Sequence, residues 1–288
     1  MNTVPAPQSS GRLEKLVHQY VKERGLAEKR VRDWVSYMAL AGALERAAEQ
    51  DRAEPHFTVR GGVAMELRLE GKSRATRDID LTYTGPGEDL VAALEEGVRI
   101  GYGPFTLRRS GEPHEMTNAR TVRVEIGVSY KGGNWGTVVV DVSQPERHQM
   151  EVELVPAFDL RVFGIEGPLH LTCLSARYHL AHKIHGMTRP AEDGTPNERV
   201  QDAIDALLLR ELMPDLAAAR AACVEVFSTR NTHSWPPTFE PPDSWVDGYR
   251  QLARELEMET DDLRVAAAEL REYIAEIDRA AASDQSME

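Results

Sequence analysis

The segment from residue 57 to residue 81 constrains the fold of this chain more than any other. A short apolar run leads into Gly61 and Gly62, and an apolar-periodic stretch follows the glycine pair. The segment ends in two aspartates, Asp78 and Asp80, which are two residues apart. This order predicts a strand, a turn, a helix and a second strand, with both aspartates on one face of the second strand.

The bulk composition is that of an ordinary globular protein. The chain has 288 residues, of which 41% are hydrophobic and 28% charged. No apolar run approaches the roughly 20 residues of a membrane helix, and the first residues lack the apolar core of a secretory signal, so we expect a short disordered lead there. Its two cysteines, Cys173 and Cys223, lie far apart, which excludes a disulfide framework and a cysteine zinc site. We therefore expect a cytoplasmic protein with no membrane partner.

The net charge of −13 is unevenly distributed along the chain. Residues 240–288 hold 14 acidic residues and five arginines, so this segment carries −9 of the total. The rest is nearly balanced, and several basic residues flank the glycine and aspartate motifs: Arg60, Arg68, Lys72, Arg74 and Arg77. A locally basic site on an acidic protein is compatible with a polyanionic substrate.

The periodicity along the chain predicts an α+β fold in three regions. These are N-terminal helices over residues 1–50 that break near Gly25, an α/β core over 51–167, and a helical domain over 168–288 with a Pro/Trp-rich linker near 234–245. Alternation from Thr121 to Ser143 predicts a β-hairpin, so the core sheet should be mixed rather than purely parallel. We expect Thr172 to cap the first helix of the last region.

The glycine and aspartate motifs each have a purely structural and a functional interpretation. Alone, Gly61 and Gly62 are most simply a tight turn, although a glycine turn before a helix also lets backbone N–H groups approach phosphate. Asp78 and Asp80 are either exposed acids on an edge strand or ligands for Mg²⁺ or Mn²⁺. The apolar neighbours of the acids predict that this strand has a buried face, which favours the metal. Together the motifs indicate chemistry on a nucleoside triphosphate.

A third carboxylate is expected from the hairpin. Asp141 lies within an apolar strand between Val138 and Val142. A carboxylate in such a run is costly to bury unless a metal or a cation accompanies it. Glu125 on the preceding strand is the competing candidate, and we favour Asp141.

The arrangement of strand, glycine pair, helix and Asp-x-Asp resembles the first motif of the AbiEii/AbiGii-type nucleotidyltransferases, the toxins of type IV toxin–antitoxin and abortive-infection pairs, which include MenT-type tRNA-modifying toxins. The resemblance covers residues 55–212. The family pattern of a glycine pair, Arg-x-Thr and Asp-hydrophobic-Asp is matched by Gly61, Gly62, Arg74, Thr76, Asp78 and Asp80.

The resemblance continues into the helical region. The family's helix with an essential lysine and its Arg-x-Lys-Asp-x-x-Asp-Leu segment are matched by Lys183, Arg199, Asp202 and Asp205. Gln201 and Ala206 depart from that pattern, and the missing lysine puts some nucleotide or acceptor contacts in doubt. Without the family pattern, Lys183 would be a lysine covering apolar surface, and the aspartates would be acids that favour a helix N-terminus.

A run of histidines precedes and follows Lys183. His179, His182 and His185 are spaced three residues apart, so all three cannot converge on one ion on a helix. We interpret them as polar-face histidines or phosphate contacts rather than as a metal site.

The resemblance implies a nucleotidyltransferase fold and a cytoplasmic enzyme that releases pyrophosphate. Its expected cofactor is Mg²⁺ or Mn²⁺ and its substrate an NTP; the implied acceptor is the tRNA 3′ end and the implied partner an AbiEi-like antitoxin, in phage defence. The implied catalytic residues are Asp78, Asp80, Lys183 and Asp202, with metal at Asp78, Asp80 and Asp141. Nucleotide contacts are expected from Arg60, Gly61, Gly62, Arg74, Thr76, Arg77 and Arg199. The alternatives are a small-molecule or protein acceptor, and a nucleotide-sensing module without catalysis.

Overall fold

The computed structural model describes residues 4–50, 56–116, 120–146, 151–191 and 194–280. The chain forms two compact units, which are described separately below. The first comprises Met1–Gly71, Ala75–Pro145 and Val152–Cys173, and the second Lys72–Arg74, Glu146–Glu151 and Leu174–Glu288. The expected boundary at residue 51 and the last part of the acidic segment, 281–288, lie outside the described residues.

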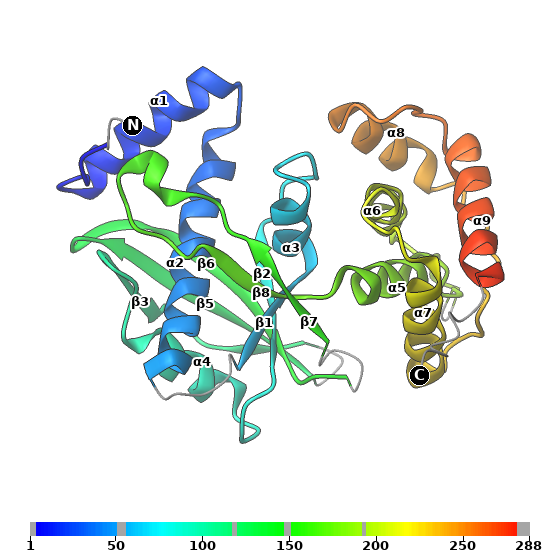
Figure 1. The fold of residues 1–288 in the computed structure, drawn as a ribbon, viewed down its shortest axis with the longest axis horizontal. Helices are drawn as coiled ribbons and strands as arrows, with labels where there is room; N and C mark the ends of the chain where they lie inside the picture. Colours follow the sequence, from blue (N-terminus) through cyan, green and yellow to red (C-terminus); the bar gives the residue numbers. More distant parts are fainter. Residues whose placement is uncertain (1–3, 51–55, 117–119, 147–150, 192–193, 281–288) are drawn as a thin grey trace, which may run out of the picture. The chain divides into compact units, whose positions relative to one another are not determined.

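The first unit is built on one mixed sheet (Figure 1). Its strand order is β3-β5-β6-β2-β1-β8-β7, and β4 pairs with β5. The strands are β1 (Phe57–Arg60), β2 (Asp78–Tyr83), β3 (Phe105–Arg109), β4 (His114–Glu115), β5 (Thr121–Tyr130), β6 (Gly133–Ser143), β7 (Val152–Pro156) and β8 (His170–Leu174). β2 runs parallel to β6 and antiparallel to β1, which confirms the predicted mixed sheet.

Two helices precede the sheet, as the sequence predicts. They are α1 (Ser10–Arg24) and α2 (Glu28–Gln50), and Gly25 ends α1 in the left-handed region, with φ of 67°. The side chain of Ser9 accepts a hydrogen bond from the backbone N–H of Arg12 at the start of α1. The expected disordered lead is wrong for residues 4–9, because the hydroxyl of Tyr130 donates to the carbonyl of Pro7, which is buried.

The hydrophobic core of the first unit lies on one face of the sheet. Helices α1, α2 and α4 (Leu90–Arg99) pack against the strands. Alternate residues of the central strands point into this core, and Ile79 and Leu81 of β2 are fully buried there. The polar residues between them therefore lie on the opposite face.

The hairpin β5–β6 and the strand–helix–strand of residues 57–83 form as predicted. Helix α3 (Gly61–Arg68) begins directly at the glycine pair. Lys131 and Gly132 have φ of 47° and 78°, the positive values that a type I′ hairpin turn needs at both central residues. The short strands β3, β4, β7 and β8 were not predicted.

The predicted helix cap at Thr172 is wrong. Thr172 lies inside strand β8, whose residue Cys173 pairs in parallel with Val59 of β1. The following helix, α5 (Ala176–Met187), begins only after Ser175. Threonine suits both a cap and a strand, and the open edge of β1 decides for the strand.

The second unit is helical. After α5 come α6 (Val200–Arg210), α7 (Leu216–Arg230), α8 (Trp245–Glu255) and α9 (Leu263–Arg279). The Pro/Trp-rich segment between α7 and α8 has no regular secondary structure, but its Phe239 is buried and its carbonyl accepts from Arg271.

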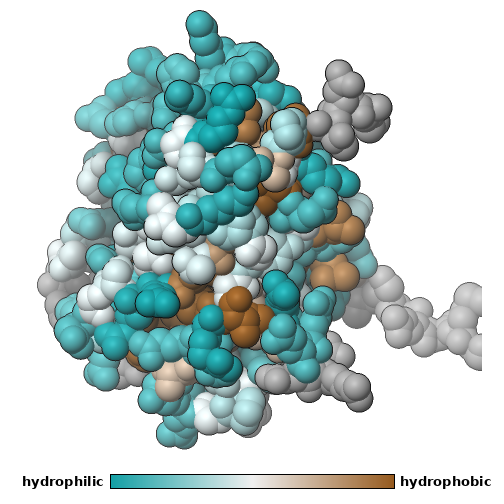
Figure 2. All heavy atoms as spheres, turned by 90° about the vertical axis from the view of Figure 1, so that its left-hand side faces the viewer, coloured by the Kyte–Doolittle hydropathy of each residue, from teal (hydrophilic) through white to brown (hydrophobic). Residues whose placement is uncertain are grey.

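The face of the molecule shown in Figure 2 is largely hydrophilic, with apolar residues in small, separate areas. Across the described residues, no helix combines the length and apolarity that crossing a bilayer demands.

Candidate functional site

Four charged residues form one row across four neighbouring strands of the first unit. In order they are Arg123 on β5, Asp141 on β6, Asp80 on β2 and Arg60 on β1. Each is the register partner of the next, and paired residues direct their side chains to the same face of a sheet. Two carboxylates therefore lie at the centre of the row, with an arginine at each end, on the face opposite the helix-covered core.

Asp78 adds a third carboxylate to this face. It opens strand β2 two residues before Asp80, and the buried Ile79 between them points into the core. The predicted placement of both aspartates on one face is confirmed. Glu125, the alternative to Asp141, is exposed and lies opposite Val139 rather than opposite either residue of the predicted pair.

The guanidinium of Arg123 forms a bidentate contact with the carboxylate of Asp141. Its Nε lies 2.7 Å from Oδ1 and its Nη2 2.7 Å from Oδ2 of Asp141. The same Nη2 lies 3.3 Å from Oδ2 of Asp78. The hydrogen bonds to Asp141 raise the pKa of Arg123 above its ordinary value. Arg123 thus neutralises charge that the carboxylates would otherwise concentrate here.

Both glycines of the pair are required by close packing around β2. A β-carbon on Gly61, which has φ of 61°, would lie 1.8 Å from Oδ2 of Asp80. A β-carbon on Gly62 would lie 2.4 Å from Oγ1 of Thr76. The carboxylate of Asp80 therefore lies at the N-terminus of α3, where only glycine leaves room for it.

A buried glutamate braces the start of β2. Glu66 on α3 accepts from the backbone N–H of Thr76 at 2.8 Å, from Nε of Arg30 at 3.2 Å and from the indole of Trp34. The hydroxyl of Thr76 lies 3.1 Å from the carbonyl and 3.3 Å from Oδ1 of Asp78. Glu66 therefore positions Asp78 through Thr76.

Two of the four arginines expected at the nucleotide, Arg60 and Arg77, lie in the first unit and differ in their surroundings. Arg60 is half-buried and donates from Nη2 to the hydroxyl of Ser143 at 2.9 Å, while its buried Nε has no hydrogen-bond partner. Arg77 is exposed to solvent.

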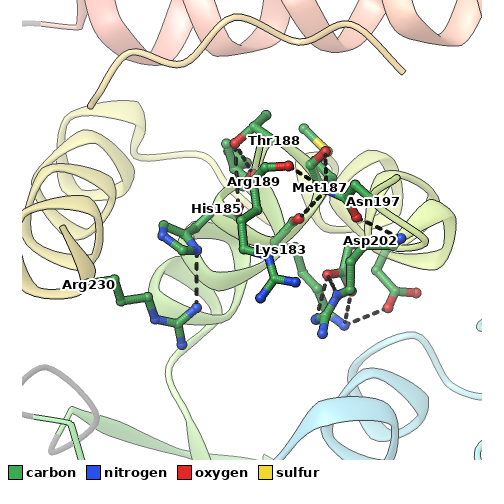
Figure 3. Close-up of polar contacts among 12 residues, drawn as sticks. Lys183, His185, Met187, Thr188, Arg189, Asn197, Asp202 and Arg230 are labelled. Atoms are coloured by element: carbon green, nitrogen blue, oxygen red, sulfur yellow. Dashed lines mark hydrogen bonds and ion pairs between the residues drawn. The ribbon is translucent and has the colours of Figure 1, made fainter. Parts of the chain in front are cut away.

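The second unit contains a buried group of opposite charges. Nζ of Lys183 on α5 lies 3.0 Å from Oδ1 of Asp202 and 2.8 Å from Oδ2 of Asp205, both on α6. Figure 3 labels Lys183 and Asp202 of this group. Arg199 contacts the other oxygen of Asp202 at 2.6 Å, and Arg74 contacts Oδ2 of Asp205 at 3.3 Å. Three cations and two carboxylates leave one positive charge in excess.

The charges of this group stabilise one another against burial. The side chains of Lys183, Asp202 and Asp205 are 9%, 4% and 0% exposed. Burial alone would lower the pKa of Lys183, but Asp202 and Asp205 outweigh it and raise that pKa. Burial would likewise raise the pKa of Asp202, but Lys183 and Arg199 hold it below its ordinary value. Both groups are therefore charged at neutral pH.

The interpretation of the histidines as polar-face residues is wrong for His179 and His185, which are buried. His185 packs its ring against Phe227 and His233, and its Nε2 lies 2.9 Å from the hydroxyl of Thr232. Burial, followed by the charge of Arg230, lowers the pKa of His185 to about 3. Figure 3 shows Arg230 and His185 in contact.

The carboxylates of the first unit have the chemistry of a magnesium site, but one of them, Asp141, is paired with an arginine. Asp78 and Asp80 offer hard oxygen ligands on one face of β2. Both oxygens of Asp141 accept from Arg123. Within the described ranges, no group of three or more His, Cys, Asp or Glu side chains is arranged to hold a metal ion. Of the three carboxylates on this face, Asp141 is the one whose two oxygens both accept from Arg123.

The predicted site residues are divided between the two units. The first unit holds Arg60, Gly61, Gly62, Thr76, Arg77, Asp78, Asp80 and Asp141, and the second holds Arg74, Lys183, Arg199 and Asp202. Sequence reasoning missed Arg123 and Glu66. Arg123 is two residues from Glu125 in the same alternating strand, and its pairing with Asp141 becomes visible only from the hairpin register.

The chain is similar to known nucleotidyltransferases in sequence and in fold. The family model for the nucleotidyl transferase AbiEii toxin of type IV toxin–antitoxin systems matches residues 42–282. The structure of MenT4, a nucleotidyltransferase toxin from Mycobacterium tuberculosis H37Rv, is similar at a TM-score of 0.60 and 15% identity, covering 94% of this chain and 91% of that chain. The antibiotic-resistance factor ANT(2'')-Ia matches at a TM-score of 0.36 and 15% identity, covering 68% of this chain and 94% of that chain. Among curated proteins, none matches the chain.

Proposed function

Because the chain belongs to the AbiEii family, the nucleotidyltransferase toxins of type IV toxin–antitoxin systems, we propose that it transfers a nucleoside monophosphate from an NTP to an RNA acceptor. The proposed acceptor is the 3′ end of tRNA, and the proposed products are the modified tRNA and pyrophosphate. A toxin of this kind halts growth, in phage defence among other settings, until its antitoxin opposes it.

The observation that carries this proposal is the placement of Asp78 and Asp80. Both lie on one face of β2, and the carboxylate of Asp80 lies beside Gly61 at the N-terminus of α3. Carboxylates that can hold Mg²⁺ are thus next to the backbone N–H groups of a helix N-terminus, which favour phosphate. When bound, Mg²⁺ would neutralise charge on the phosphates and on the leaving pyrophosphate.

We assign the residues of the first unit to metal binding and to phosphate binding. Asp78 and Asp80 hold the metal, Gly61 and Gly62 allow the backbone to approach the phosphates, and Arg60 and Arg77 neutralise phosphate charge. The unpartnered Nε of Arg60 is consistent with that role, because a buried donor without a partner is otherwise unfavourable. Thr76 keeps Asp78 in position through its hydroxyl.

We also propose roles for the charged group of the second unit. Lys183 would neutralise developing negative charge on the triphosphate, and Asp202 would orient Lys183 or accept the proton of the attacking hydroxyl. Arg74 and Arg199 would contribute further positive charge. The excess positive charge of this group supports an anionic ligand. The proposed partner is a cognate antitoxin, as expected for a type IV pair.

The test is transfer of label from each α-phosphate-labelled NTP to total tRNA. We expect the wild-type chain to label tRNA and Asp80→Ala to lose transfer by at least a hundredfold, a magnitude typical of losing charge stabilisation in a transition state. Glu88→Gln, which changes an exposed acid just after β2, should leave transfer unchanged. Normal transfer by Asp80→Ala would refute the assignment.

The same reaction run with other acceptors identifies the substrate class. Label in a protein lysate or an aminoglycoside, with none in tRNA, would overturn the tRNA proposal and keep the nucleotidyltransferase. Tight NTP binding with no release of pyrophosphate and no label in any acceptor would favour a nucleotide-sensing module instead.

A further inference from the structure

The contact between Arg123 and Asp141 is fixed by the pairing of strands β5 and β6. Arg123 and Asp141 are direct register partners on the antiparallel strands β5 and β6. Their Cβ atoms are therefore held close by the backbone pairing, at the roughly 5 Å of opposed residues. The side chain of Asp141 is only 12% exposed, and that of Arg123 is 40% exposed.

The contact between Arg123 and Asp141 is bidentate. Two parallel N–H donors of one guanidinium meet the two oxygens of one carboxylate, each at 2.7 Å. Fork-to-fork pairs of this kind are among the stronger hydrogen bonds in proteins. The guanidinium also reaches Asp78 at 3.3 Å, so one cation already lies between two of the three carboxylates.

This arrangement bears on the number of ions the site holds. Two-metal sites for phosphoryl chemistry place their ions about 3.5–4 Å apart, which requires carboxylates that ligate both ions. Asp141 is the register neighbour of Asp80 and would be the natural ligand for a second ion. Both of its oxygens accept hydrogen bonds from Arg123, so an ion bound there would lie directly beside the positive charge of the guanidinium.

We propose that Arg123 takes the place of the second cation, so that the chain binds one divalent ion, on Asp78 and Asp80. This inference rests on the proposed nucleotidyltransferase function. The guanidinium supplies a permanent positive charge beside the phosphates, and Asp141 holds the guanidinium in position. Asp141 is then a positioning residue for Arg123 and no metal ligand.

The test measures how many Mn²⁺ ions bind per protein chain and does not depend on catalytic activity. Mn²⁺ is titrated into the full chain in the presence of a non-hydrolysable NTP analogue, and free Mn²⁺ is read by electron paramagnetic resonance. We expect the wild-type chain to bind one Mn²⁺. Arg123→Gln releases Asp141, so this variant should bind a second Mn²⁺.

A matched arginine separates this effect from a general loss of charge. Arg108 is an exposed arginine on the neighbouring strand β3, opposite Gly127 of β5. Arg108→Gln should bind one Mn²⁺, as the wild type does. Arg123→Gln should also gain more thermal stability from added Mn²⁺ than either of the other two proteins, because three carboxylates lie together without their arginine.

The outcomes distinguish this inference from the proposed function. Two Mn²⁺ ions in the wild type would overturn the inference even if Arg123→Gln failed to fold, and would leave the nucleotidyltransferase intact. Equal counts in the wild type and Arg123→Gln would also overturn it. A wild type that binds no Mn²⁺ with the analogue would overturn the metal part of the proposed function as well, and the Asp80→Ala transfer assay decides that function independently.

Discussion

The carboxylate of Asp80 occupies the space that a side chain on Gly61 would need. A β-carbon there would lie 1.8 Å from Oδ2 of Asp80, closer than any non-bonded contact allows. Gly61 also has a positive φ of 61°. The glycine and the aspartate are therefore one structural unit, although 18 residues of helix and loop separate them in the chain.

We expect Gly61→Ala to lose both stability and transfer activity. The positive φ alone costs about 1–2 kcal/mol of unfolding free energy for an L-residue, and displacement of Asp80 adds to it. Transfer should fall on the order of a hundredfold, as for a misplaced catalytic group. Gly25→Ala is the matched control, because Gly25 has φ of 67° with no atom within 4 Å of the added carbon. Equal losses of stability and activity in the two variants would contradict this reasoning. Urea denaturation and the tRNA labelling assay measure both quantities.

Glu66→Gln should weaken the brace on Asp78. The amide can still accept from the N–H of Thr76, but its NH₂ group then faces the donors of Arg30 and Trp34. We expect a loss of about 2–4 kcal/mol of unfolding free energy, as when a buried charged network loses one partner. Transfer should also fall in conditions where the variant remains folded. Glu70→Gln, in an exposed position close by, should change neither measurement. Full transfer by folded Glu66→Gln would show that the brace is purely structural.

Removal of the Lys183 charge should destabilise the second unit. Lys183→Met leaves Asp202 and Asp205 buried with less positive charge, so we expect a loss of about 3–5 kcal/mol of unfolding free energy. Lys22→Met, at an exposed site on α1, should cost almost nothing. The double variant Lys183→Met/Asp205→Asn should be less destabilised than the sum of its single changes, because the pair acts as a unit. Additive losses in a double-mutant cycle would argue against that coupling.

The burial of His185 predicts a loss of stability in acid. Its pKa is lowered to about 3 by burial and then by Arg230, whereas the unfolded chain titrates near pH 6.5. Between these values the unfolded chain binds a proton that the folded chain does not, so stability is retained above about pH 6.5 and lost as the pH falls toward about 3. The slope from this group reaches up to ~1.4 kcal/mol per pH unit.

His185→Gln should flatten this part of the stability profile, measured by urea denaturation at a series of pH values. His233, whose pKa burial also lowers, continues to contribute in the same direction. His18→Gln is the control, since the side chain of His18 is 71% exposed. Identical slopes for the wild type and His185→Gln would show that another group controls acid unfolding.

Local patterns predicted most of the fold. The break at Gly25, the strand–helix–strand of residues 57–83 and the hairpin of β5 and β6 each depend on short-range periodicity and turn residues. The strand β8 was missed, because its five residues, His170–Leu174, are too few to distinguish a strand from the start of a helix by their pattern. Its pairing with β1 is a contact between residues 59 and 173, which periodicity does not report.

The candidate site was predictable where its residues lie close in sequence. Asp78, Asp80 and the glycine pair are local, and Asp141 was noticeable because an acid interrupts an apolar strand. Arg123 and Glu66 were missed because each acts through distant partners. The histidines of α5 were misjudged because helical spacing shows which residues share a face, whereas burial depends on what packs against that face.

The sequence by itself determined most of the helices, the β5–β6 hairpin, and that two aspartates share one face of β2 after a glycine pair. Dihedral preference and side-chain alternation are properties of neighbouring residues, and they require no knowledge of the fold. Only the tertiary structure decided that Arg123, Asp141, Asp80 and Arg60 stand in one row, because that row depends on the register of four strands. The glycine pair, first a sign of phosphate binding, is also the space that the carboxylate of Asp80 occupies.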